Sequence, residues 1–318
     1  MGRIAAICIS SQRGTQKQEV SEAVLKPDWG IVGDAHAGSW HRQVSLLALE
    51  KIEAFRAKGA DISFGAFGEN LIMEGFDLRN VPVGTVIRAG ESLLELTQIG
   101  KECHSHCEIF RAMGECIMPR EGVFAKVVKG GTIRPGDEAE LIPLDKDRPF
   151  TAAVITLSDQ GAAGKREDLS GPWIREFLTE NGYEVIETLL LADEQPALER
   201  HLCRLSDQRQ VNVIFTTGGT GFSKRDITPE ATLAVCDRMA DGVAQAIRQY
   251  SLTITGRAML SRGVSGIRKG TLIVNLPGSL KAVRESLEYV LPYLGHGLGV
   301  LRGTDGECGG GGGCSDAG

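Results

Sequence analysis

A glycine-rich segment in the second half of the chain carries residue types that bind phosphate. The mostly apolar run 211–215 predicts a buried strand, which leads into the loop Thr216-Thr217-Gly218-Gly219-Thr220-Gly221. Glycines allow the backbone to turn sharply and to direct several N–H groups toward one anion. Arg225 and Asp226 follow; a cation can hold phosphate oxygens and a carboxylate can hold Mg²⁺. The segment predicts a phosphate site, and the alternative for a glycine loop taken alone is a plain tight turn.

A helix is expected directly after this loop. Thr228 can cap its N-terminus, Pro229 suits its first turn, and Glu230 places a carboxylate in that turn. The order of strand, glycine loop and helix is typical of a phosphate site.

Acidic residues follow the neighbouring predicted strands as well. Strands are expected at 152–157 and 184–191, and they end near Asp159 and Asp193. Because the carboxyl ends of parallel strands face one crevice, we expect these carboxylates to meet Asp226 beside the glycine loop. Such a group would repel itself without a divalent cation, which favours Mg²⁺ with a nucleoside triphosphate. Taken singly, Asp159 or Asp193 can also be a helix cap.

The second half of the chain alternates strands with helices. Its remaining elements are expected as a strand at 271–276 and helices at 172–180, 194–205, 229–239, 241–253 and 279–293. Ser170 can cap the first of these helices. Repeated βαβ units imply an α/β three-layer sandwich with a mainly parallel sheet.

The first half predicts mostly β-structure. Strands are expected at 3–9, 43–47, 85–88, 92–99 and 138–142, with a helix near 48–58. Many short strands between glycine turns indicate a closed or nearly closed barrel. A polar segment bracketed by prolines, 145–150, is expected to be a linker. The expected domains are therefore a barrel at 1–144 and an α/β domain at 151–302, followed by a flexible Gly/Cys tail at 303–318.

Thiols and imidazoles gather in the first half. The cluster consists of Cys103, His104, His106, Cys107 and Cys116. It can bind Zn²⁺, although the usual second ligand pair is absent, or its cysteines can pack in a core. A third interpretation is a thiolate that handles sulfur or a soft metal, because Lys101 and a helix start after Cys103 would lower the thiol pKa. The sequence leaves open which of the three cysteines acts.

The composition is that of a globular protein. The 318 residues are 42% hydrophobic and 24% charged, with a net charge of -6 and no face-sized block of Lys and Arg, so we expect no nucleic-acid partner. No apolar run reaches the roughly 20 residues of a membrane span, and residues 1–10 lack signal-peptide features. We therefore expect a cytoplasmic protein without membrane contact. In that compartment the eight cysteines are not a disulfide framework, and the tail thiols Cys308 and Cys314 either deliver sulfur or metal or have no role.

Several motifs occur in a fixed order across residues 1–144. They are Gly30-x-x-Gly33-Asp34-x-His36, His41-Arg42-Gln43-Val44-Ser45, Phe67-Gly68-Glu69-Asn70-Leu71, Lys101-Glu102-Cys103 and Pro135-Gly136-Asp137. In content and order they resemble the MOSC domain, a β-barrel named after the C-terminal domain of molybdenum-cofactor sulfurases. The resemblance implies a barrel that binds molybdenum cofactor or handles its sulfur, with Cys103 as the catalytic thiol. His36, His41, Arg42 and Arg120 are candidates for contacts to an anionic pterin phosphate, and the alternative for each is an ordinary turn or surface residue.

A second ordered set of motifs covers residues 151–300. It consists of Ser158-Asp159, Arg166-Glu167-Asp168-x-Ser170-Gly171-Pro172, the glycine loop with Arg225-Asp226-x-Thr228-Pro229-Glu230, Leu260-Ser261-Arg262 and Asn275-Leu276-Pro277-Gly278-Ser279. This set resembles the MogA and MoaB group of molybdopterin adenylyltransferases, to which plant Cnx and animal gephyrin domains also belong. The resemblance implies that the terminal phosphate of molybdopterin attacks the α-phosphate of ATP, giving adenylylated molybdopterin and pyrophosphate.

The second resemblance also implies roles for single residues. Asp193 and Asp226 are the expected catalytic carboxylates and Mg²⁺ ligands. The expected contacts to ATP and molybdopterin come from Ser158, Asp159, Thr217, Gly218, Gly219, Thr220, Gly221, Arg225 and Ser279. Members of the family form trimers, so we expect a homotrimer that uses small-molecule substrates. Contact with other molybdenum-cofactor assembly proteins is compatible with this role.

Two further interpretations belong to different functional classes. In the first, the C-terminal half is a pterin-binding scaffold without transfer activity and the barrel carries finished cofactor. The presence of both Asp193 and Asp226 favours catalysis over this scaffold. In the second, the chain is an unrelated nucleotide binder with a structural zinc.

Overall fold

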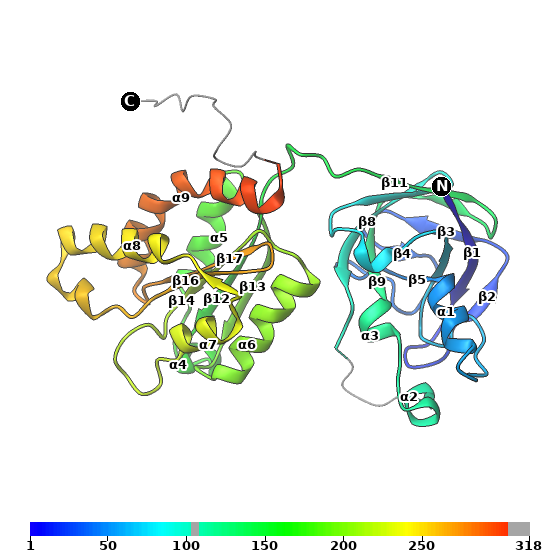
Figure 1. Cartoon of the computed structure of the whole chain (residues 1–318), viewed down its shortest axis with the longest axis horizontal. Helices are drawn as coiled ribbons and strands as arrows, with labels where there is room; N and C mark the ends of the chain where they lie inside the picture. Colours follow the sequence, from blue (N-terminus) through cyan, green and yellow to red (C-terminus); the bar gives the residue numbers. More distant parts are fainter. Residues whose placement is uncertain (103–107, 305–318) are drawn as a thin grey trace. The chain divides into compact units, whose positions relative to one another are not determined.

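The computed structural model describes residues 1–102 and 108–304 of the chain. The chain forms two compact units, Met1–Asp145 and Lys146–Gly318 (Figure 1). Within the described ranges, none of the helices combines the length and the apolar composition that a bilayer crossing requires.

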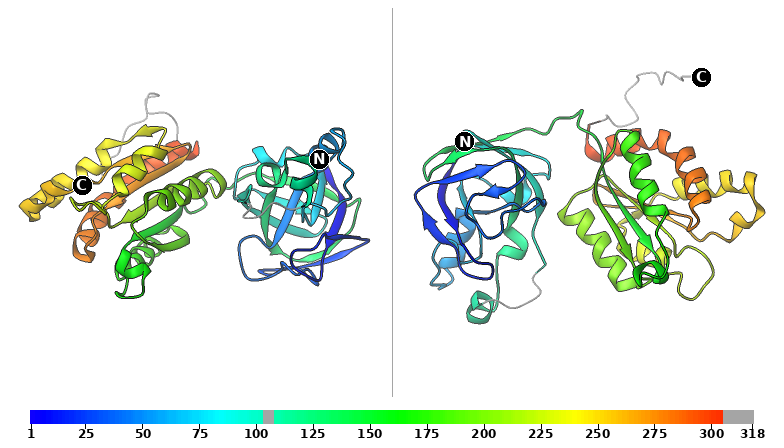
Figure 2. Two further views of the ribbon diagram at one scale, coloured as in Figure 1. Left: turned by 90° about the horizontal axis from the view of Figure 1, so that it is seen from below. Right: turned by 180° about the vertical axis from the view of Figure 1, so that it is seen from behind.

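Seven strands of the N-terminal unit close into a barrel, which confirms the expected architecture. The strands are β1 (Gly2–Ile9), β5 (Val44–Ala48), β6 (Leu71–Glu74), β7 (Val86–Ala89), β8 (Ser92–Ile99), β9 (Val123–Lys129) and β11 (Glu138–Ile142). They pair in the order β11-β7-β8-β9-β5-β6-β1, and pairing of β11 with β1 completes the ring. Each neighbouring pair is antiparallel except β5 and β6, which are parallel. The views in Figures 1 and 2 show these strands curving around one interior.

Shorter elements surround the ring. They are β2 (Gln18–Val20), which pairs with β1, a small sheet in the order β10 (Gly131–Ile133), β3 (Ala23–Lys26) and β4 (Gly30–Ile31), and the helices α1 (Leu49–Arg56), η1 (Leu78–Asn80), α2 (Glu108–Met113) and α3 (Met118–Glu121). The segment Val44–Ala48 shows how the sequence builds this unit. Val44 and Leu46 belong to the core inside the barrel, whereas Leu47 packs in a second core with Ile52 and Phe55 of α1. Successive strand residues face opposite sides, so a fully apolar strand serves both cores.

The C-terminal unit is a six-stranded, mostly parallel sheet. Its strands, in sheet order, are β13 (Glu184–Leu191), β12 (Thr151–Leu157), β14 (Val213–Thr217), β17 (Thr271–Leu276), β16 (Ser265–Arg268) and β15 (Arg238–Met239). The first four run parallel, and the last two pairings are antiparallel. The carboxyl ends of β13, β12, β14 and β17 therefore lie at one edge of the sheet.

Helices cover both faces of this sheet and complete the expected three layers. One face packs against α5 (Ser170–Glu180), α8 (Asp241–Ile254) and α9 (Leu280–Arg302), and the other against α6 (Gln195–Cys203) and α7 (Thr228–Val235) (Figures 1 and 2). The short helices α4 (Asp159–Ala162) and η3 (Gly256–Leu260) and a π-helical segment η2 (Arg204–Gln208) lie in the connections. The apolar side chains of Val154 and Phe215 face the first layer, and those of Ile155 and Ile214 face the second.

Three predicted elements differ from the observed ones. The helix expected at 229–239 ends at Val235, because Cys236 is extended, and the chain then forms β15 beside β16. The helix expected at 194–205 ends at Cys203 and continues as the π-helical segment. The last helix continues to Arg302, since its buried face extends through Leu298, and Gly303 ends it with a left-handed φ of 76°.

Two predicted helix caps are wrong. Thr228 does not cap α7; its hydroxyl donates instead to the carbonyl oxygen of Gly218 at 2.8 Å. Ser170 lies inside α5, and the carboxylate of Asp168 accepts from the backbone N–H groups of Ser170 and Gly171 at 3.0 Å. At α5 the carboxylate of Asp168 thus replaces the hydroxyl of Ser170, whereas no side chain caps α7. Which local hydrogen bond a hydroxyl makes depends on tertiary contacts.

The last helical residue connects the two ends of the C-terminal unit. Arg302 donates to the carbonyl oxygens of Arg148 at 2.6 Å and Pro149 at 2.9 Å, and to the side chain of Asn212 at 2.9 Å. Its guanidinium also lies over the ring of Phe150. The segment that enters the unit is thus held against the helix that leaves it.

Candidate active site

The glycine loop after β14 has backbone geometry that only glycine accepts easily. Gly218 and Gly219 have φ angles of 93° and 62°, in the left-handed region. A Cβ at Gly218 would overlap the carbonyl oxygen of Leu157, and one at Gly219 would overlap the hydroxyl of Thr228. The loop therefore lies directly against the ends of β12 and α7.

Two predicted carboxylates hold each other in place at the ends of β12 and β13. The backbone N–H of Asp159 donates to the carboxylate of Asp193 at 3.0 Å, and the N–H of Asp193 donates to that of Asp159 at 3.0 Å. A Cβ on Gly219 would lie 3.1 Å from Oδ1 of Asp193. The reciprocal bonds thus place the Asp193 carboxylate at the glycine loop.

Arg225 neutralises part of this acidic group. Its guanidinium donates to both oxygens of Asp159, at 2.9 and 2.8 Å, and to Glu194 at 3.0 Å. The hydrogen bond from Arg225 lowers the pKa of Asp159, so that this carboxylate stays ionised. The charge of Asp159 is therefore matched by a protein cation.

Asp226 lies against another residue of the glycine loop, Gly221. Its Oδ2 accepts the N–H of Ser223 at 2.8 Å and would lie 2.9 Å from a Cβ placed on Gly221. Burial raises the pKa of Asp193, and the charges of Asp159 and Asp226 raise it further. The structure therefore places Asp193 and Asp226 against the same loop, at Gly219 and Gly221, and pairs Asp193 with Asp159; their catalytic role stays a prediction.

Three predicted ligand contacts use their hydroxyls within the protein. Ser158 accepts the N–H of Gly161 at 3.0 Å and caps α4, while Ser279 caps α9 by accepting the N–H of Ala282 at 3.4 Å. Thr217 is buried, and its hydroxyl donates to the carbonyl oxygen of Pro277 at 2.6 Å. These hydroxyls are therefore already engaged in bonds within the protein. Thr220 is also buried, and Gly221 borders Asp226.

One residue at this site carried no chemical signal in the sequence. Arg262 follows η3, yet its side chain contacts Gly221, Asp226 and Glu230. The only hint was its place in the motif Leu260-Ser261-Arg262. Its partners lie more than thirty positions away in the chain, so local patterns could not reveal the contacts.

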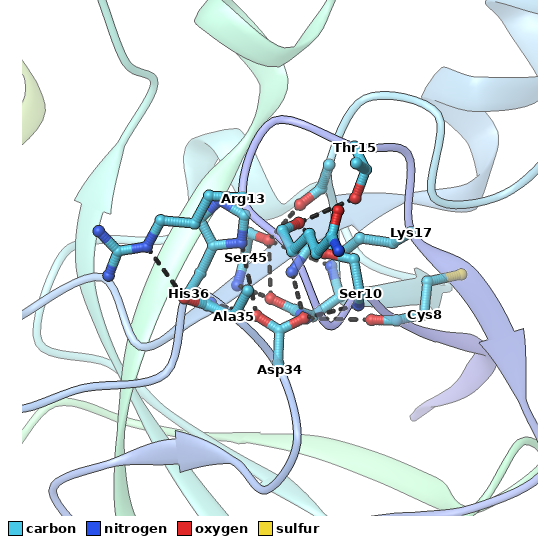
Figure 3. Close-up of polar contacts among 12 residues, drawn as sticks. Cys8, Ser10, Arg13, Thr15, Lys17, Asp34, Ala35, His36 and Ser45 are labelled. Carbon is cyan, nitrogen blue, oxygen red and sulfur yellow. Dashed lines mark hydrogen bonds and ion pairs between the residues drawn. The ribbon is translucent and has the colours of Figure 1, made fainter.

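A second polar cluster lies in the N-terminal unit, and its ion pair is buried. Lys17 and Asp34 are joined by an Nζ–Oδ2 contact of 2.6 Å, and each side chain is 1% exposed (Figure 3). Asp34 also accepts the N–H groups of Ser10 at 3.2 Å and His36 at 2.9 Å, and the side-chain amide of Asn70 at 3.1 Å. Burial alone would raise the pKa of Asp34, but Lys17 holds it below its usual value.

Two further side chains, those of His36 and Arg13, border the buried pair. His36 Nδ1 lies 3.5 Å from Oδ1 of Asp34, and Nε of Arg13 donates to the carbonyl oxygen of Ala35 at 3.0 Å (Figure 3). Burial lowers the pKa of His36, and the charge of Lys17 lowers it further, so the neutral imidazole is favoured. Elsewhere in the unit, His41 shares a contact of 3.0 Å with Gln98, and Arg42 lies over the rings of Trp40 and Phe124.

The predicted thiol site falls largely outside the described residues. Cys103 and Cys107 lie there, as do the tail residues Cys308 and Cys314. Cys8 is described; it is fully buried, and burial raises its pKa to about 12, so it is a poor nucleophile. Within the described ranges, no three His, Cys, Asp or Glu side chains form a group that could hold a metal ion.

Comparison with known families divides the chain in the same way. Residues 153–296 match the family described as "probable molybdopterin binding domain", and residues 33–140 match the MOSC domain. This is the order of domains that the motifs indicated.

Curated relatives match the C-terminal half. A molybdopterin adenylyltransferase of Helicobacter pylori is 41% identical over 153 residues, which cover 48% of this chain and 87% of that protein. The molybdopterin adenylyltransferase of Escherichia coli K12 is 44% identical over 140 residues, 43% of this chain and 71% of that protein. Among solved structures, the molybdopterin biosynthesis enzyme MoaB of Thermus thermophilus is 45% identical, with a TM-score of 0.47, over 48% of this chain and 97% of its own.

Proposed function

Because the chain belongs, through residues 153–296, to the family of the probable molybdopterin binding domain, we propose that its C-terminal unit is a molybdopterin adenylyltransferase. The observation that supports the proposal is that Asp193 and Asp226 both lie against the same glycine loop, at Gly219 and Gly221 respectively. Relatives named for this activity cover the same half of the chain, which supports the assignment.

The proposed reaction joins two small molecules through phosphorus. An oxygen of the terminal phosphate of molybdopterin attacks the α-phosphorus of ATP and forms a new P–O bond. The bond between the α-phosphorus and its bridging oxygen breaks, and pyrophosphate leaves with that electron pair. The protein contributes mainly by placing the two phosphates and balancing their charge.

The donor set of the site fits Mg²⁺. Asp193 and Asp226 repel each other, and Mg²⁺ usually takes one or two carboxylates together with substrate phosphates and water. These two residues would hold the ion, whose positive charge would offset that of the phosphates and carboxylates. Asp159 is less available for this purpose because Arg225 already matches its charge.

The remaining residues act by position. The N–H groups of Gly218, Gly219 and Gly221 are proposed donors to phosphate oxygens, as loops with left-handed glycines commonly provide. Arg225 is exposed, and it can turn from Asp159 and Glu194 to a phosphate when a polyanion arrives. Ser158, Thr217 and Ser279 maintain the walls of the crevice through the bonds described above.

For the N-terminal unit we propose cofactor binding or sulfur handling, in keeping with its MOSC domain. Cys103 is the proposed thiol. The complete protein is proposed to act in the cytoplasm as a homotrimer, and molybdenum-cofactor synthesis is the pathway that both halves serve.

The test is turnover of the purified full chain with molybdopterin and Mg-ATP. We expect adenylylated molybdopterin and pyrophosphate in equal amounts, and a loss of about 10²–10³-fold or more in the Asp226→Asn variant, as when one charge-stabilising group is removed. Asp237→Asn is the matched control, because Asp237 accepts the N–H of Lys269 in the turn that enters β17, at the opposite end of the sheet. Tight pterin binding without ATP consumption would favour a scaffold instead.

A further inference from the structure

Arg262 joins three parts of the proposed site with one guanidinium. Its Nε donates to the carbonyl oxygen of Gly221 at 2.6 Å, and one terminal nitrogen donates to that of Asp226 at 2.7 Å. The other terminal nitrogen pairs with the carboxylate of Glu230 in the first turn of α7. The backbone N–H of Arg262 also donates to the carbonyl oxygen of Thr220 at 2.9 Å.

The segment that Arg262 holds is otherwise open to solvent. Residues 222–225 are exposed, and Phe222 is 70% exposed. The Asp226 carboxylate bonds to the N–H of Ser223 within the same turn, which shapes the turn without connecting it to the sheet. Arg225 connects it to Asp159 and Glu194, but through the contacts that a polyanion would compete for.

We propose that Arg262 is a positioning residue that fixes the Asp226 carboxylate relative to the glycine loop. Its two carbonyl contacts bracket residues 221–226, so the loop N–H groups and the carboxylate face the same ligand. When Arg225 turns toward phosphate, Arg262 is the side chain that keeps this segment in place. The inference rests on the proposed function for its ligand, Mg-ATP, and on the ligand-free structure for its geometry.

The planar guanidinium group of arginine is needed for these three contacts. Three acceptors in different directions are reached by three nitrogens of one planar group, whereas a lysine ammonium is a single point on a flexible stem. Arg262→Lys therefore keeps the charge near Glu230 and loses at least one carbonyl contact. Glu230→Gln has the opposite effect, because it removes the ion pair and leaves both carbonyl contacts.

The first measurement is amide hydrogen exchange of residues 218–226 in the ligand-free full chain. We expect exchange in Arg262→Lys to be about tenfold faster than in the unaltered protein, as the loss of one or two charge-assisted hydrogen bonds implies. Glu230→Gln should change it less. Unaltered exchange in Arg262→Lys would overturn the inference.

The second measurement is Mg-ATP affinity by titration calorimetry, followed by steady-state kinetics. In Arg262→Lys we expect affinity for Mg-ATP to fall about tenfold and kcat to fall with it, since a misplaced carboxylate affects both binding and reaction. Arg302→Lys is the matched control: Arg302 also contacts two carbonyl oxygens and a side-chain oxygen, but at the other end of β14. A purely structural role for Arg262 would give equal results in the two variants and would contradict positioning.

The outcomes separate the inference from the proposed function. If the unaltered protein binds Mg-ATP without transferring adenylate, the activity is wrong, while loop exchange and Mg-ATP affinity still decide the role of Arg262. If the unaltered protein transfers adenylate, the proposed activity stands. If Arg262→Lys then has the same amide hydrogen exchange, Mg-ATP affinity and kcat as the unaltered protein, the positioning role fails.

Discussion

The two polar clusters of this molecule use similar residues in opposite environments. In the N-terminal unit, Lys17 and Asp34 are buried, and the carboxylate accepts four hydrogen bonds. In the C-terminal unit, Asp193 and Asp226 flank a glycine loop near the surface and repel each other. In the N-terminal cluster the negative charge of Asp34 is paired with the positive charge of Lys17. In the C-terminal cluster the negative charges of Asp193 and Asp226 are available to a bound cation.

This difference separates a structural role from a binding role. A buried charge is tolerated only with a partner and full hydrogen bonding, so the Lys17–Asp34 pair maintains the path of the segments it joins. Carboxylates with unmatched charge cost stability, and that cost is offset when a cation or a phosphate-bound metal arrives. The contrast can be tested by altering one member of each cluster.

The largest effect is expected from Lys17→Met. Removal of the ammonium leaves the buried Asp34 carboxylate without a counter-charge, which should destabilise the N-terminal unit by about 3–5 kcal/mol. Adenylyl transfer by the C-terminal unit should persist at temperatures where the altered barrel is still folded. Native-state hydrogen exchange of β1 and β5, read by mass spectrometry, measures the local loss.

The double variant Lys17→Met with Asp34→Asn is the control for that result. It removes both charges and keeps an acceptor oxygen for the N–H of His36, so much of the lost stability should return. A double variant as unstable as Lys17→Met alone would show that packing of the lysine stem, and not the ion pair, is responsible.

A smaller effect, on activity, is expected from Gly219→Ala. The added methyl group would push against the hydroxyl of Thr228 and the carboxylate of Asp193, so kcat/KM should fall about a hundredfold, or ~2.7 kcal/mol. Gly182→Ala is the matched control, because Gly182 also has a left-handed φ, 82°, but open space around its Cβ position. The Gly182→Ala variant should lose about 1 kcal/mol in its free energy of unfolding and keep its full activity. Equal activities in the two variants would contradict a catalytic role for the loop.

The smallest change concerns pH. Since the folded-state pKa of Asp193 is raised above the ordinary value, its contribution to stability is present at low pH and is lost as pH rises through the raised pKa. Mg²⁺ binds the carboxylate form, so it should lower this pKa and bind more tightly as pH increases through it. Carbon-13 NMR titration of the Asp193 carboxyl, with and without Mg²⁺, measures both shifts. Asp226→Asn should also lower the pKa of Asp193, because it removes a neighbouring negative charge. If Mg²⁺ leaves the titration of Asp193 unchanged, the metal does not bind at this site.

Sequence patterns were sufficient to predict the main elements of both units. The apolar run 152–157, for example, corresponds to the buried strand β12, and the order of strands and helices indicated the three-layer sandwich. The barrel strands β6 and β9 and the strand β16 of the C-terminal sheet were missed, as were the short strands β2, β3, β4 and β10. The two-residue β15 was missed as well, because its pairing with β16 depends on partners distant in sequence and its local pattern continues that of a helix.

The candidate site was predictable where residues follow strands directly. Asp193 and Asp226 could be placed at one crevice because parallel strands end at the same edge. Arg262 could not, since its acceptors are backbone carbonyls whose position depends on the finished fold. The Lys17–Asp34 pair was missed for a similar reason, because a lysine at the end of an exposed loop gives no local sign of burial.

The hydrogen bonds from Arg302 to the carbonyl oxygens of Arg148 and Pro149 have a consequence for protein engineering. Since the segment that enters this unit lies beside the end of the helix that leaves it, a short peptide should suffice to link the two covalently, and new termini could be opened in an exposed turn such as the one at Gly164. Because its two ends lie close together, this domain should also tolerate insertion into a surface loop of another protein.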